Sequence, residues 1–531
     1  MAAVRGDTKA YLVGGGIANL ASAVVLVRDG GVPGESIHIF EEKPVPGGSL
    51  DAVGSPSEGY LMRGGRMFEE HFVCTYDVLD SIPSPDAPDK SIKEDLFEFF
   101  KEYTWHATSR LIDRGAVVDS SRMGLSTHDQ LALAQLMMLG EDELGGKRID
   151  QCFLPAFFTT NFWYMWCTVF AFEPWHSAIE MRRYLMRFIH LMPAMSTMED
   201  IFHTRYNQYD SIVRPVMGWL AERGVRFHGG VRVTDLDFAP VGVAVGGGYR
   251  VERIHLSRDG ASEEIAVGER DVVIVTNGSM TSNSTFGSMT SPAALDRGAP
   301  EGSWALWRRL AEGRPVFGNP AAFSSDIDRS KWMSFTVTTR SPLFRKLMED
   351  YTHSELGRAG LMTFKDSGWL MTINLHHNPE FPDQPENVDI WWGYGLYPDR
   401  AGDFVHKPMA ECTGEELLVE VFSQLRMTEH LPELIRDSTC VPCMMPYITS
   451  HFMPRAKGDR PEVVPVGSTN LAFVGQFCEM PDDTVFTVEY SVRSAMVAVY
   501  TLLGIDRPVP ALYRGYRDVN VLLNAVKTVI R

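Results

Sequence analysis

The segment Arg63–Phe72, RGGRMFEEHF, combines residues that bind anions, allow close approach to the backbone and transfer protons. Gly64 and Gly65 lack the side chains that would keep a ligand away from the main chain. The arginine on either side of them can bind an anion, and Glu69 and Glu70 are candidate proton acceptors. Solvent-facing helix positions are the alternative interpretation of the two glutamates. We therefore expect this loop to lie at a binding site.

Tyr184 belongs to a second segment with acid–base side chains, Phe172–Tyr184. We predict that a helix begins with this segment and has Pro174 in its first turn. Its apolar face is formed by Ala178, Met181, Leu185 and Phe188. Tyr184 lies at the edge of that face, where Glu180 and Arg187 can tune the acidity of its phenol beside an apolar cavity. A core tyrosine with a satisfied hydroxyl is the alternative.

The chain opens with the strand, turn and helix pattern of a dinucleotide-binding site. Residues 10–13 form the predicted strand, a glycine turn follows, and the predicted helix covers residues 20–27. Glycines in such a turn let a pyrophosphate approach the helix N-terminus, and an acid after the second strand accepts ribose hydroxyls. That second strand is predicted at residues 37–40. The cofactor-binding residues predicted from this pattern are Gly14, Gly16, Ala18, Asn19, which replaces the usual third glycine, and Glu41.

A second glycine turn favours FAD over a nicotinamide dinucleotide. Pro46-Gly47-Gly48-Ser49 resembles the second glycine turn of the large FAD-binding class related to glutathione reductase and the amine oxidases. Residues 231–236, 271–278 and 471–476 are typical of later strands in that class, and a helix through Val499 is expected to point its N-terminus at the flavin or pyrophosphate. The cofactor-binding residues predicted from these segments are Gly48, Ser49, Val233 against the adenine, Asn277, Gly475, Asp482 and Thr484.

Length and composition predict several lobes. The 531 residues exceed what one hydrophobic core usually covers, and 44% apolar with 22% charged residues is typical of a globular protein. The 68 acidic and 50 basic residues give a net charge of -18, which repels nucleic acid. We predict an α/β fold with a discontinuous, Rossmann-like FAD-binding domain from residues 1–90, 206–300 and 455–500. A helical segment (91–205), a strand-rich substrate domain (301–454) and a helical C-terminal part (501–531) complete the prediction.

Cysteine usage and the N-terminus predict a cytoplasmic protein. Seven scattered cysteines favour reduced thiols, and Cys440 and Cys443 are interpreted as buried thiols beside a turn, so no metal site is predicted. Residues 1–8 have no secretory signal. Residues 152–172 carry no charge and are long enough to span a membrane. Their proline and their polar cluster at 159–161 favour a buried wall that lines an apolar cavity.

The end of the chain, residues 519–531, is predicted to be an amphipathic helix that carries Lys527 and Arg531. Packing against the protein itself is the favoured interpretation, and peripheral contact with a membrane surface is the alternative.

Long motifs between about Lys9 and about Tyr500 resemble the oleate hydratases, also called the myosin-cross-reactive antigen family. The motifs are VPGGSLDA, RGGRMFEEHF, FAFEPWHSAIEMRRYLMRF, RYNQYDS, PCMMPYITSHFMPR, GSTNLAFVGQF and PDDTVFTVEYSVRSA. The resemblance implies an FAD-dependent, redox-neutral lyase that adds water across a cis double bond of a free unsaturated fatty acid, typically oleate to 10-hydroxystearate. FAD, which works best reduced in this family, is expected to shape and charge the site rather than store electrons.

The resemblance also assigns roles in catalysis. Tyr184 matches the family tyrosine to which proton donation is assigned. Met67 occupies the position of a glutamate that, in better-known relatives, orients or activates water, and methionine cannot accept a proton. Glu69, Glu70 or the flavin must then hold the water, or this branch divides the work differently.

The remaining roles concern the flavin and the fatty-acid head group. Gly64 and Gly65 are expected to allow close approach of the isoalloxazine, with Arg63 and Arg66 supplying positive charge beside reduced flavin or phosphate. Gln208 matches a family residue near the substrate head group. Asn374, His376 and Glu380 align with a second head-group cluster, in which the first two can donate hydrogen bonds but Glu380 would repel a carboxylate.

An N-terminal extension before the first strand helps many relatives to dimerise. Only a few residues precede the first predicted strand here, so a monomer or weak homodimer is expected.

Two other functions remain as alternatives. A flavin oxidoreductase acting on a lipid or amine would share all the cofactor motifs, but it must turn over electrons. A non-catalytic fatty-acid- and FAD-binding protein, which Met67 makes conceivable, would bind fatty acid without forming a product.

Overall fold

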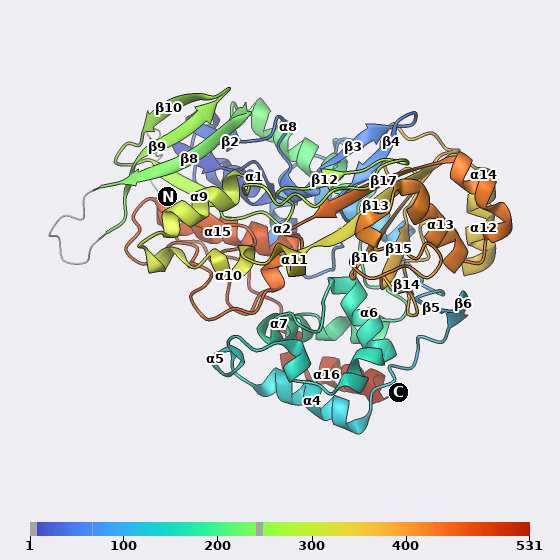
Figure 1. Cartoon of the computed structure of the whole chain (residues 1–531). Coiled ribbons are helices and arrows are strands. Elements are labelled where there is room, and N and C mark those ends of the chain that lie inside the picture. Colours follow the sequence, from blue (N-terminus) through green and yellow to red (C-terminus); the bar gives the residue numbers. More distant parts are fainter. Residues whose placement is uncertain (1–7, 66, 240–247, 531) are drawn as a thin grey trace.

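Five short segments from distant parts of the chain pair as one parallel sheet. The computed structural model describes residues 8–65, 67–239 and 248–530, and this sheet lies in the upper left of Figure 1. In order across the sheet, the strands are β18 (Leu471–Val474), β11 (Val272–Thr276), β1 (Ala10–Val13), β2 (Ile37–Glu41) and β7 (Arg226–Gly229). β1, β11 and β18 consist almost only of buried residues, which is why they appear as continuous apolar runs in the sequence.

Helices cover this sheet, and an antiparallel sheet lies beside it. The helices are α1 (Ile17–Arg28), α2 (Val73–Leu79), α8 (Arg214–Glu222), α9 (Gly302–Ala311) and α15 (Val488–Leu503), with α1 packed on α15. The smaller sheet has the order β10 (Ala261–Ala266), β9 (Val251–Arg258), β8 (Val231–Phe238). α1 begins three residues earlier than predicted, because the backbone turns at its N-cap Gly16 and is helical from Ile17 onward.

An eight-stranded sheet forms the second region, on the right of Figure 1. Its order is β12 (Thr285–Phe286), β17 (Ser438–Met445), β13 (Trp332–Thr339), β16 (Asp389–Gly395), β15 (Met371–Leu375), β14 (Leu361–Phe364), β5 (Leu111–Asp113) and β6 (Ala116–Val118). The helices α12 (Pro342–Thr352), α13 (Gly414–Gln424) and α14 (Leu431–Arg436) belong to this region, and the hairpin β3 (Ala52–Ser55) and β4 (Gly59–Met62) packs on β13. The segment predicted to be helical, 91–205, thus supplies two strands, β5 and β6.

The two cysteines of the Cys-Val-Pro-Cys sequence lie inside β17 rather than beside a turn. Cys440 and Cys443 are both buried, and β17 pairs with β13 along its whole length. Residues three apart in a strand point to opposite faces, so these two thiols do not face each other. The prediction of a turn at this place was wrong.

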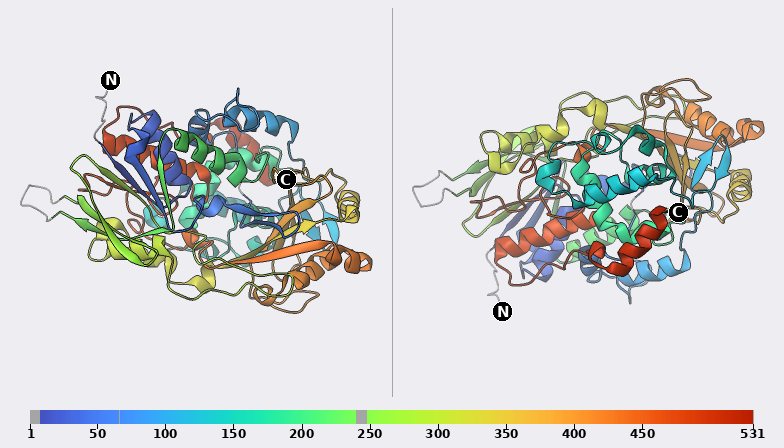
Figure 2. Two further views of the ribbon diagram at one scale, coloured as in Figure 1. Left: turned by 90° about the horizontal axis from the view of Figure 1, so that it is seen from above. Right: turned by 90° about the horizontal axis from the view of Figure 1, so that it is seen from below.

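A layer of helices lies below both sheets (Figures 1 and 2). It contains α4 (Thr127–Met138), α5 (Glu141–Leu144), α6 (Asn161–Phe170), α7 (Ala178–Arg187), the 3-10 helix η5 (Ile189–Ala194) and α16 (Val519–Ile530), while α3 (Ile92–Glu102) packs on α2. The apolar segment 152–172 folds as a short 3-10 helix, η4 (Pro155–Thr159), followed by α6. Among the described residues, no helix has both the length and the apolar character to cross a bilayer.

α16 packs on η5 with Ala525 buried, so the predicted packing of the terminal helix is confirmed. Arg531 lies outside the described residues. The opposite side of the helix is apolar and exposed, and it is formed by Val519, Leu523, Val526 and Ile530.

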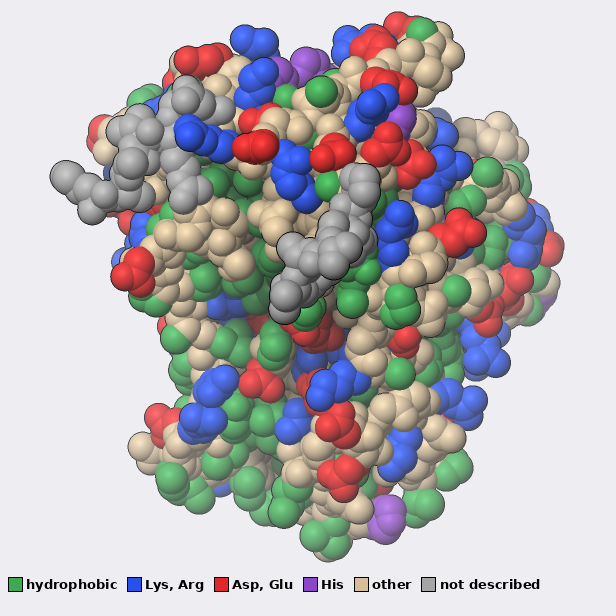
Figure 3. Space-filling view, turned by 90° about the vertical axis from the view of Figure 1, so that its left-hand side faces the viewer, with side chains coloured by type: hydrophobic (Ala, Val, Ile, Leu, Met, Phe, Trp, Pro, Cys, Tyr) green, Lys and Arg blue, Asp and Glu red, His purple; other side chains and the backbone are tan. Residues whose placement is uncertain are grey.

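The left-hand side of the molecule in Figure 1 is the face drawn in Figure 3. Charged side chains of both signs are scattered over this face, with hydrophobic side chains along its lower edge.

Candidate active site

The two predicted glycine turns meet at the carboxyl ends of β1 and β11. Gly16 and Gly47 form an isolated parallel bridge, and a Cβ added at Gly48 would lie 3.1 Å from Gly16 Cα. The turns border cavity A, which encloses about 1180 Å³ of empty space, part of it open to solvent. Among the predicted cofactor residues, those that line cavity A are Gly14, Gly16, Ala18, Glu41, Gly48, Ser49, Val233 and Gly475.

Other predicted cofactor residues lie elsewhere. Asn19 is buried, and its Nδ2 donates hydrogen bonds to Val13 O (2.8 Å), Gly14 O (2.9 Å) and Thr276 Oγ1 (3.1 Å). The amide therefore joins β1 to the end of β11, which explains why a side chain replaces the third glycine here. Asn277 is fully buried behind the cavity wall.

The helix α15 does begin at cavity A, but with residues that the sequence analysis missed. Thr487, Val488 and Ser491 line the cavity, and Thr487 Oγ1 caps the helix by accepting from Tyr490 N. The predicted Asp482 is instead on the surface and pairs with Arg514 at 3.2 Å, and Thr484 is buried outside the lining. The cap signal Thr487-Val488-Glu489 was present in the sequence and marks the true start of the helix.

In the described part of the chain, two cavities adjoin cavity A, and another lies beyond one of them. Cavity B is lined by Gly64, Gly65, Met67, Gln208, Asn374, His376 and Glu380, among others, and touches cavity A at Leu50. Cavity C is lined by Gly65, Met67, Glu69, Phe170, Tyr184 and Tyr394, among others, and shares Phe486, Thr487 and Val488 with cavity A. Cavity D is almost wholly apolar and lies beyond cavity C, between α6 and η5.

The loop around Gly65 and Met67 therefore separates cavities B and C. Both residues line both cavities, and a Cβ at Gly65 would meet no atom within 4 Å. Met67 packs among apolar side chains that include Trp105, Met198 and Leu361. Arg66 lies outside the described residues. The prediction that segment 152–172 lines an apolar cavity is confirmed, because α6 contributes Val169 and Phe170 to cavities C and D.

The helix that carries Tyr184 begins at Ala178 and not at Phe172, so Pro174 precedes it. The carbonyls of Pro174 and His176 accept hydrogen bonds from Asp150 N (2.7 Å) and Ile149 N (2.9 Å). His176 Nδ1 also accepts from Glu173 N at 2.8 Å. These contacts hold an irregular turn where the sequence pattern alone allowed a helix.

Tyr184 is 1% exposed and has aromatic rings around it at the wall of cavity C. Its Oη donates a 2.5 Å hydrogen bond to Val485 O. Burial raises the pKa of Tyr184 well above its usual value, and the charges of Glu180 and Asp483 raise it further. The phenol is therefore fully protonated near neutral pH, as a proton donor must be, and it must turn from Val485 O to reach a ligand.

Glu180 belongs to a buried ion cluster beneath Tyr184. Its Oε1 accepts from Arg455 Nε at 2.8 Å and from Arg460 Nη1 at 2.9 Å. The neighbouring Arg183 pairs with Glu479 at 2.7 Å and donates to Met480 O at 3.1 Å. The cluster thus holds the segment 479–485, which ends in the carbonyl that accepts from Tyr184.

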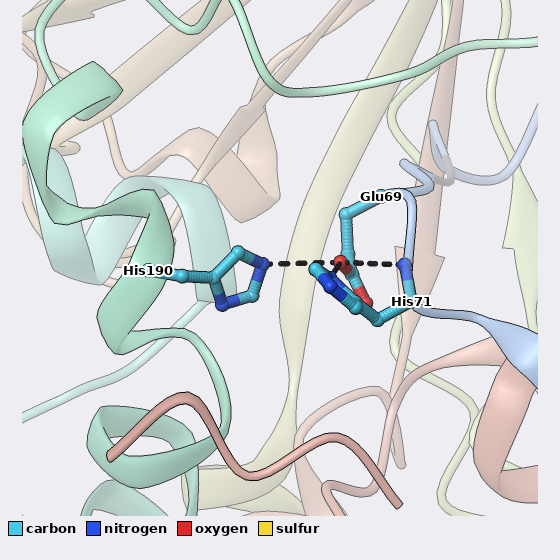
Figure 4. A group of neighbouring side chains, drawn as sticks. All are labelled: Glu69, His71 and His190. Atoms are coloured by element: carbon cyan, nitrogen blue, oxygen red, sulfur yellow. Dashed lines mark hydrogen bonds and ion pairs between the residues drawn. The ribbon is translucent and has the colours of Figure 1, made fainter. Parts of the chain in front are cut away.

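The two glutamates after Met67 have opposite environments, and neither lies in a helix, since α2 begins only at Val73. Glu70 is exposed, with 64% of its side chain open to solvent. Glu69 is buried and contacts His71 and His190, as Figure 4 shows. Its Oε2 lies 2.9 Å from His71 Nδ1 and 3.1 Å from His190 Nε2, and its Oε1 accepts from Arg187 Nη2 at 2.7 Å.

These contacts make Glu69 a fixed anion rather than a ready base. Burial alone would raise the pKa of Glu69, but hydrogen bonds from His190 and His71 and the charge of Arg187 bring it well below its usual value. The donor atoms of Glu69, His71 and His190 lie within 4.8 Å of one another, as in metal sites. Because Arg187 shares the carboxylate, we assign this cluster to holding the loop at cavity C.

Arg63 is buried at cavity A, where it supports the second glycine turn. Its guanidinium donates to Asp51 Oδ1 (2.7 Å), Gly48 O (2.6 Å) and Thr281 O (3.2 Å). Arg63 is outside the lining of cavity C. It therefore shapes the wall of cavity A rather than facing Tyr184.

Cavity B brings together the four residues predicted at the head group, namely Gln208, Asn374, His376 and Glu380. Burial raises the pKa of Glu380 well above its usual value, and the charge of Asp210 raises it further. Burial also lowers the pKa of His376 to about 3. The raised pKa favours the neutral acid form of Glu380, in which the repulsion expected of this residue is absent.

A chain with this fold has known counterparts among solved structures. Cyclohexylamine oxidase from Brevibacterium oxydans IH-35A matches with a TM-score of 0.51 over 94% of this chain and 99% of its own, at 11% identity. An oxidoreductase from Methanosarcina mazei matches with a TM-score of 0.50 over 92% and 99%, at 12% identity. The chain therefore has the predicted Rossmann-like fold, of the amine oxidase type.

The family follows from the sequence itself. The profile of the MCRA family matches residues 7–500, and the chain belongs to that family. It is 42% identical to the oleate hydratase of Streptococcus pyogenes serotype M49 (strain NZ131), over 97% of this chain and 88% of that protein. It is 34% identical to the linoleate hydratase of Lactiplantibacillus plantarum, over 98% of each. The family identified from the motifs is confirmed.

Proposed function

We propose that this protein is an FAD-dependent fatty-acid hydratase that adds water across a cis double bond. The observation that carries the proposal is that Tyr184 and Met67 line the same cavity, which lies between an apolar cavity and the cavity at the glycine turns. Relatives named for oleate and linoleate hydration support the same reaction. In this proposal the hydrocarbon tail lies in cavity D, the double bond in cavity C and the carboxylate in cavity B.

The wall of cavity A suits FAD. The two glycine turns present backbone without side chains, the start of α15 offers a helix N-terminus, and Glu41 lies at the end of β2. Gly14, Gly16, Gly48, Ser49, Val233 and Gly475 would hold the cofactor together with Thr487 and Ser491. Bound flavin, most active when reduced, would contribute charge and shape to cavity C. The protein would act in the cytoplasm as a monomer or weak dimer.

The reaction needs a proton on one alkene carbon and a water oxygen on the other. Tyr184 would give its phenolic proton to the first carbon, and the water would bond to the second. The proton that this water loses would restore the phenol through solvent, so that no electron acceptor is consumed. Glu69 would orient groups beside cavity C, because its low pKa makes it a poor proton acceptor.

The function is tested by mass spectrometry of the products from oleate, purified protein, FAD and a reductant in ¹⁸O-labelled water. We expect a product heavier than oleate by one labelled water, without stoichiometric use of an electron acceptor. A product that forms only with an electron acceptor would indicate an oxidoreductase. Fatty-acid binding without any product from oleate, palmitoleate or linoleate would indicate a binding protein.

Met67→Glu is expected to raise turnover, because it restores a carboxylate where cavities B and C meet. The gain should be on the order of 10²-fold, the lower end of the range for general acid–base catalysis. Steady-state turnover of oleate measures it, with Met67→Gln as a control that has the same shape but cannot accept a proton. Equal rates for the Glu and Gln variants would contradict a proton-accepting role at this position.

We further propose that the exposed apolar side of α16 contacts a lipid bilayer, where free fatty acids partition. α16 packs on η5, whose Met192 and Ala194 line cavity D, so this surface lies next to the proposed tail site. Lys527 adds positive charge to the same helix.

Leu523→Asp with Val526→Asp is expected to reduce sedimentation with vesicles of anionic phospholipid at least several-fold, because both side chains are about half exposed and apolar. Turnover of detergent-dispersed oleate should stay unchanged. Val466→Asp, at a position that is 76% exposed outside α16, is the matched control. Equal sedimentation of both variants would argue against this contact surface.

A further inference from the structure

Glu380 lines cavity B, and hydrogen bonds hold its backbone in place on both sides of the residue. Its N–H donates to Gln384 Oε1 at 2.6 Å, and its carbonyl accepts from Asn207 N at 2.8 Å. The residue is 6% exposed. His376 Nδ1 lies 3.5 Å from Glu380 Oε2, which is longer than a good hydrogen bond.

The described residues that line cavity B are polar or apolar, and none of them is a lysine or an arginine. Arg66, between the lining residues Gly65 and Met67, lies outside the described residues. Asp51 is paired with Arg63 at 2.7 Å, and Asp210, behind Glu380, is paired with Arg214 at 3.0 Å. Burial lowers the pKa of His203 to about 4, so that His203, like His376, is neutral.

Two buried polar atoms at this cavity have no partner in the part of the chain that the structure describes. His376 Nε2 can donate to a ligand oxygen in one tautomer, whereas Asn374 Oδ1 only accepts and would pair with a protonated group such as a carboxyl O–H. Leaving such atoms unpaired costs free energy, so a polar ligand group is expected beside them. A carboxylate accepts hydrogen bonds from an amide N–H₂, from a neutral imidazole N–H and from a protonated carboxyl group. The described residues of cavity B offer all three kinds of donor.

We propose that Glu380 is a specificity-determining residue that binds the fatty-acid carboxylate as a neutral acid, its O–H donating to a carboxylate oxygen. The proposal rests on the proposed function, which supplies the ligand. The complex contains one proton shared between two carboxyl groups, a short charge-assisted hydrogen bond. Below the pKa of Glu380 in the free protein, the carboxylate binds without taking up a proton; above it, each binding event must take one up.

The test is calorimetry of palmitoleate binding to the FAD-loaded protein from about pH 6 to about pH 9. We expect an affinity that is constant at low pH and then falls about tenfold per pH unit, as the uptake of one proton requires. In the pH range where the affinity falls, the binding enthalpies measured in two buffers of different ionisation enthalpy should differ by the amount that uptake of one proton requires. Palmitoleyl alcohol, which has no carboxylate, should bind with the same affinity at every pH.

Two variants separate this role from a structural one. Glu380→Gln keeps a neutral donor, so it should bind palmitoleate within a few-fold of the wild type at low pH and lose the pH dependence. Asp210→Asn should move the break to lower pH, because the charge of Asp210 raises the pKa of Glu380. Flavin absorbance and the unfolding temperature check that both variants are folded.

An unchanged pH dependence in Glu380→Gln would overturn the assignment, as would a break that Asp210→Asn does not move. Hydration activity is measured on the same samples. If the wild type forms hydroxylated product while these tests fail, the hydratase function stands and only the role of Glu380 is wrong. If neither the wild type nor the variants form hydroxylated product, the proposed function itself is wrong.

Discussion

Tyr184→Phe is expected to lower turnover by about 10²–10⁴-fold while FAD remains bound, the usual loss when a general acid is removed. The variant deletes only the hydroxyl that donates to Val485 O at the wall of cavity C. The ring remains among Phe170, Phe172 and Phe188, so packing should change little. Turnover of oleate and the flavin absorbance of the purified variant are the measurements.

Tyr394→Phe is a matched control for this prediction. Tyr394 also lines cavity C, is also buried, and also donates its hydroxyl to a backbone carbonyl, that of Thr168. If proton donation is specific to Tyr184, the Tyr394 variant should keep turnover within a few-fold of the wild type. Near-wild-type turnover of Tyr184→Phe would remove Tyr184 from its proposed role.

Arg187→Met is expected to lower the free energy of unfolding by about 3–5 kcal/mol, the cost of leaving a buried charge unpaired. Arg187 and Glu69 are 2% and 1% exposed, and their charged atoms lie 2.7 Å apart. The loss should be measured by urea unfolding at a fixed FAD concentration, because cofactor binding adds to apparent stability. The loop at cavity C should loosen with it, so turnover should fall as well.

Two further variants define the origin of this loss. Replacing both partners, as Arg187→Met with Glu69→Gln, should cost less than the single change, because no uncompensated charge remains. Arg232→Met, which breaks a half-exposed pair with Glu42, should cost no more than about 1 kcal/mol. A single Arg187 variant as stable as the wild type would contradict the importance of the buried pair.

The same pair has a consequence for acid stability. The pKa of Glu69 is lower in the folded protein than in the unfolded chain, where it is ordinary. Its stabilising contribution is therefore present above the ordinary pKa and is lost as the pH falls toward the lowered folded value. Arg187→Met should make stability less dependent on pH in that acidic range, which urea unfolding at several pH values would measure.

Features that depend on neighbouring residues could be predicted from the sequence alone. The glycine turns at residues 14–16 and 47–48, the buried strands, and the apolar wall of residues 152–172 follow from local composition, since close backbone approach and burial leave direct marks on residue type. The long motifs were sufficient to identify the family. The spacing of apolar residues placed Tyr184 at the edge of one helix face, but only the family resemblance assigned proton donation to it.

Which polar side chains are buried, and with which partners, depends on contacts between segments that are distant in the sequence. Glu69 and Glu70 are adjacent in sequence, yet Arg187 and His190 enclose the first while solvent surrounds the second. The sequence alone indicates that Glu380 repels a carboxylate, whereas its burial near Asp210 raises its pKa and favours the neutral acid. The charge state of a carboxyl group depends on the dielectric and the charges around it, and residues distant in sequence supply both.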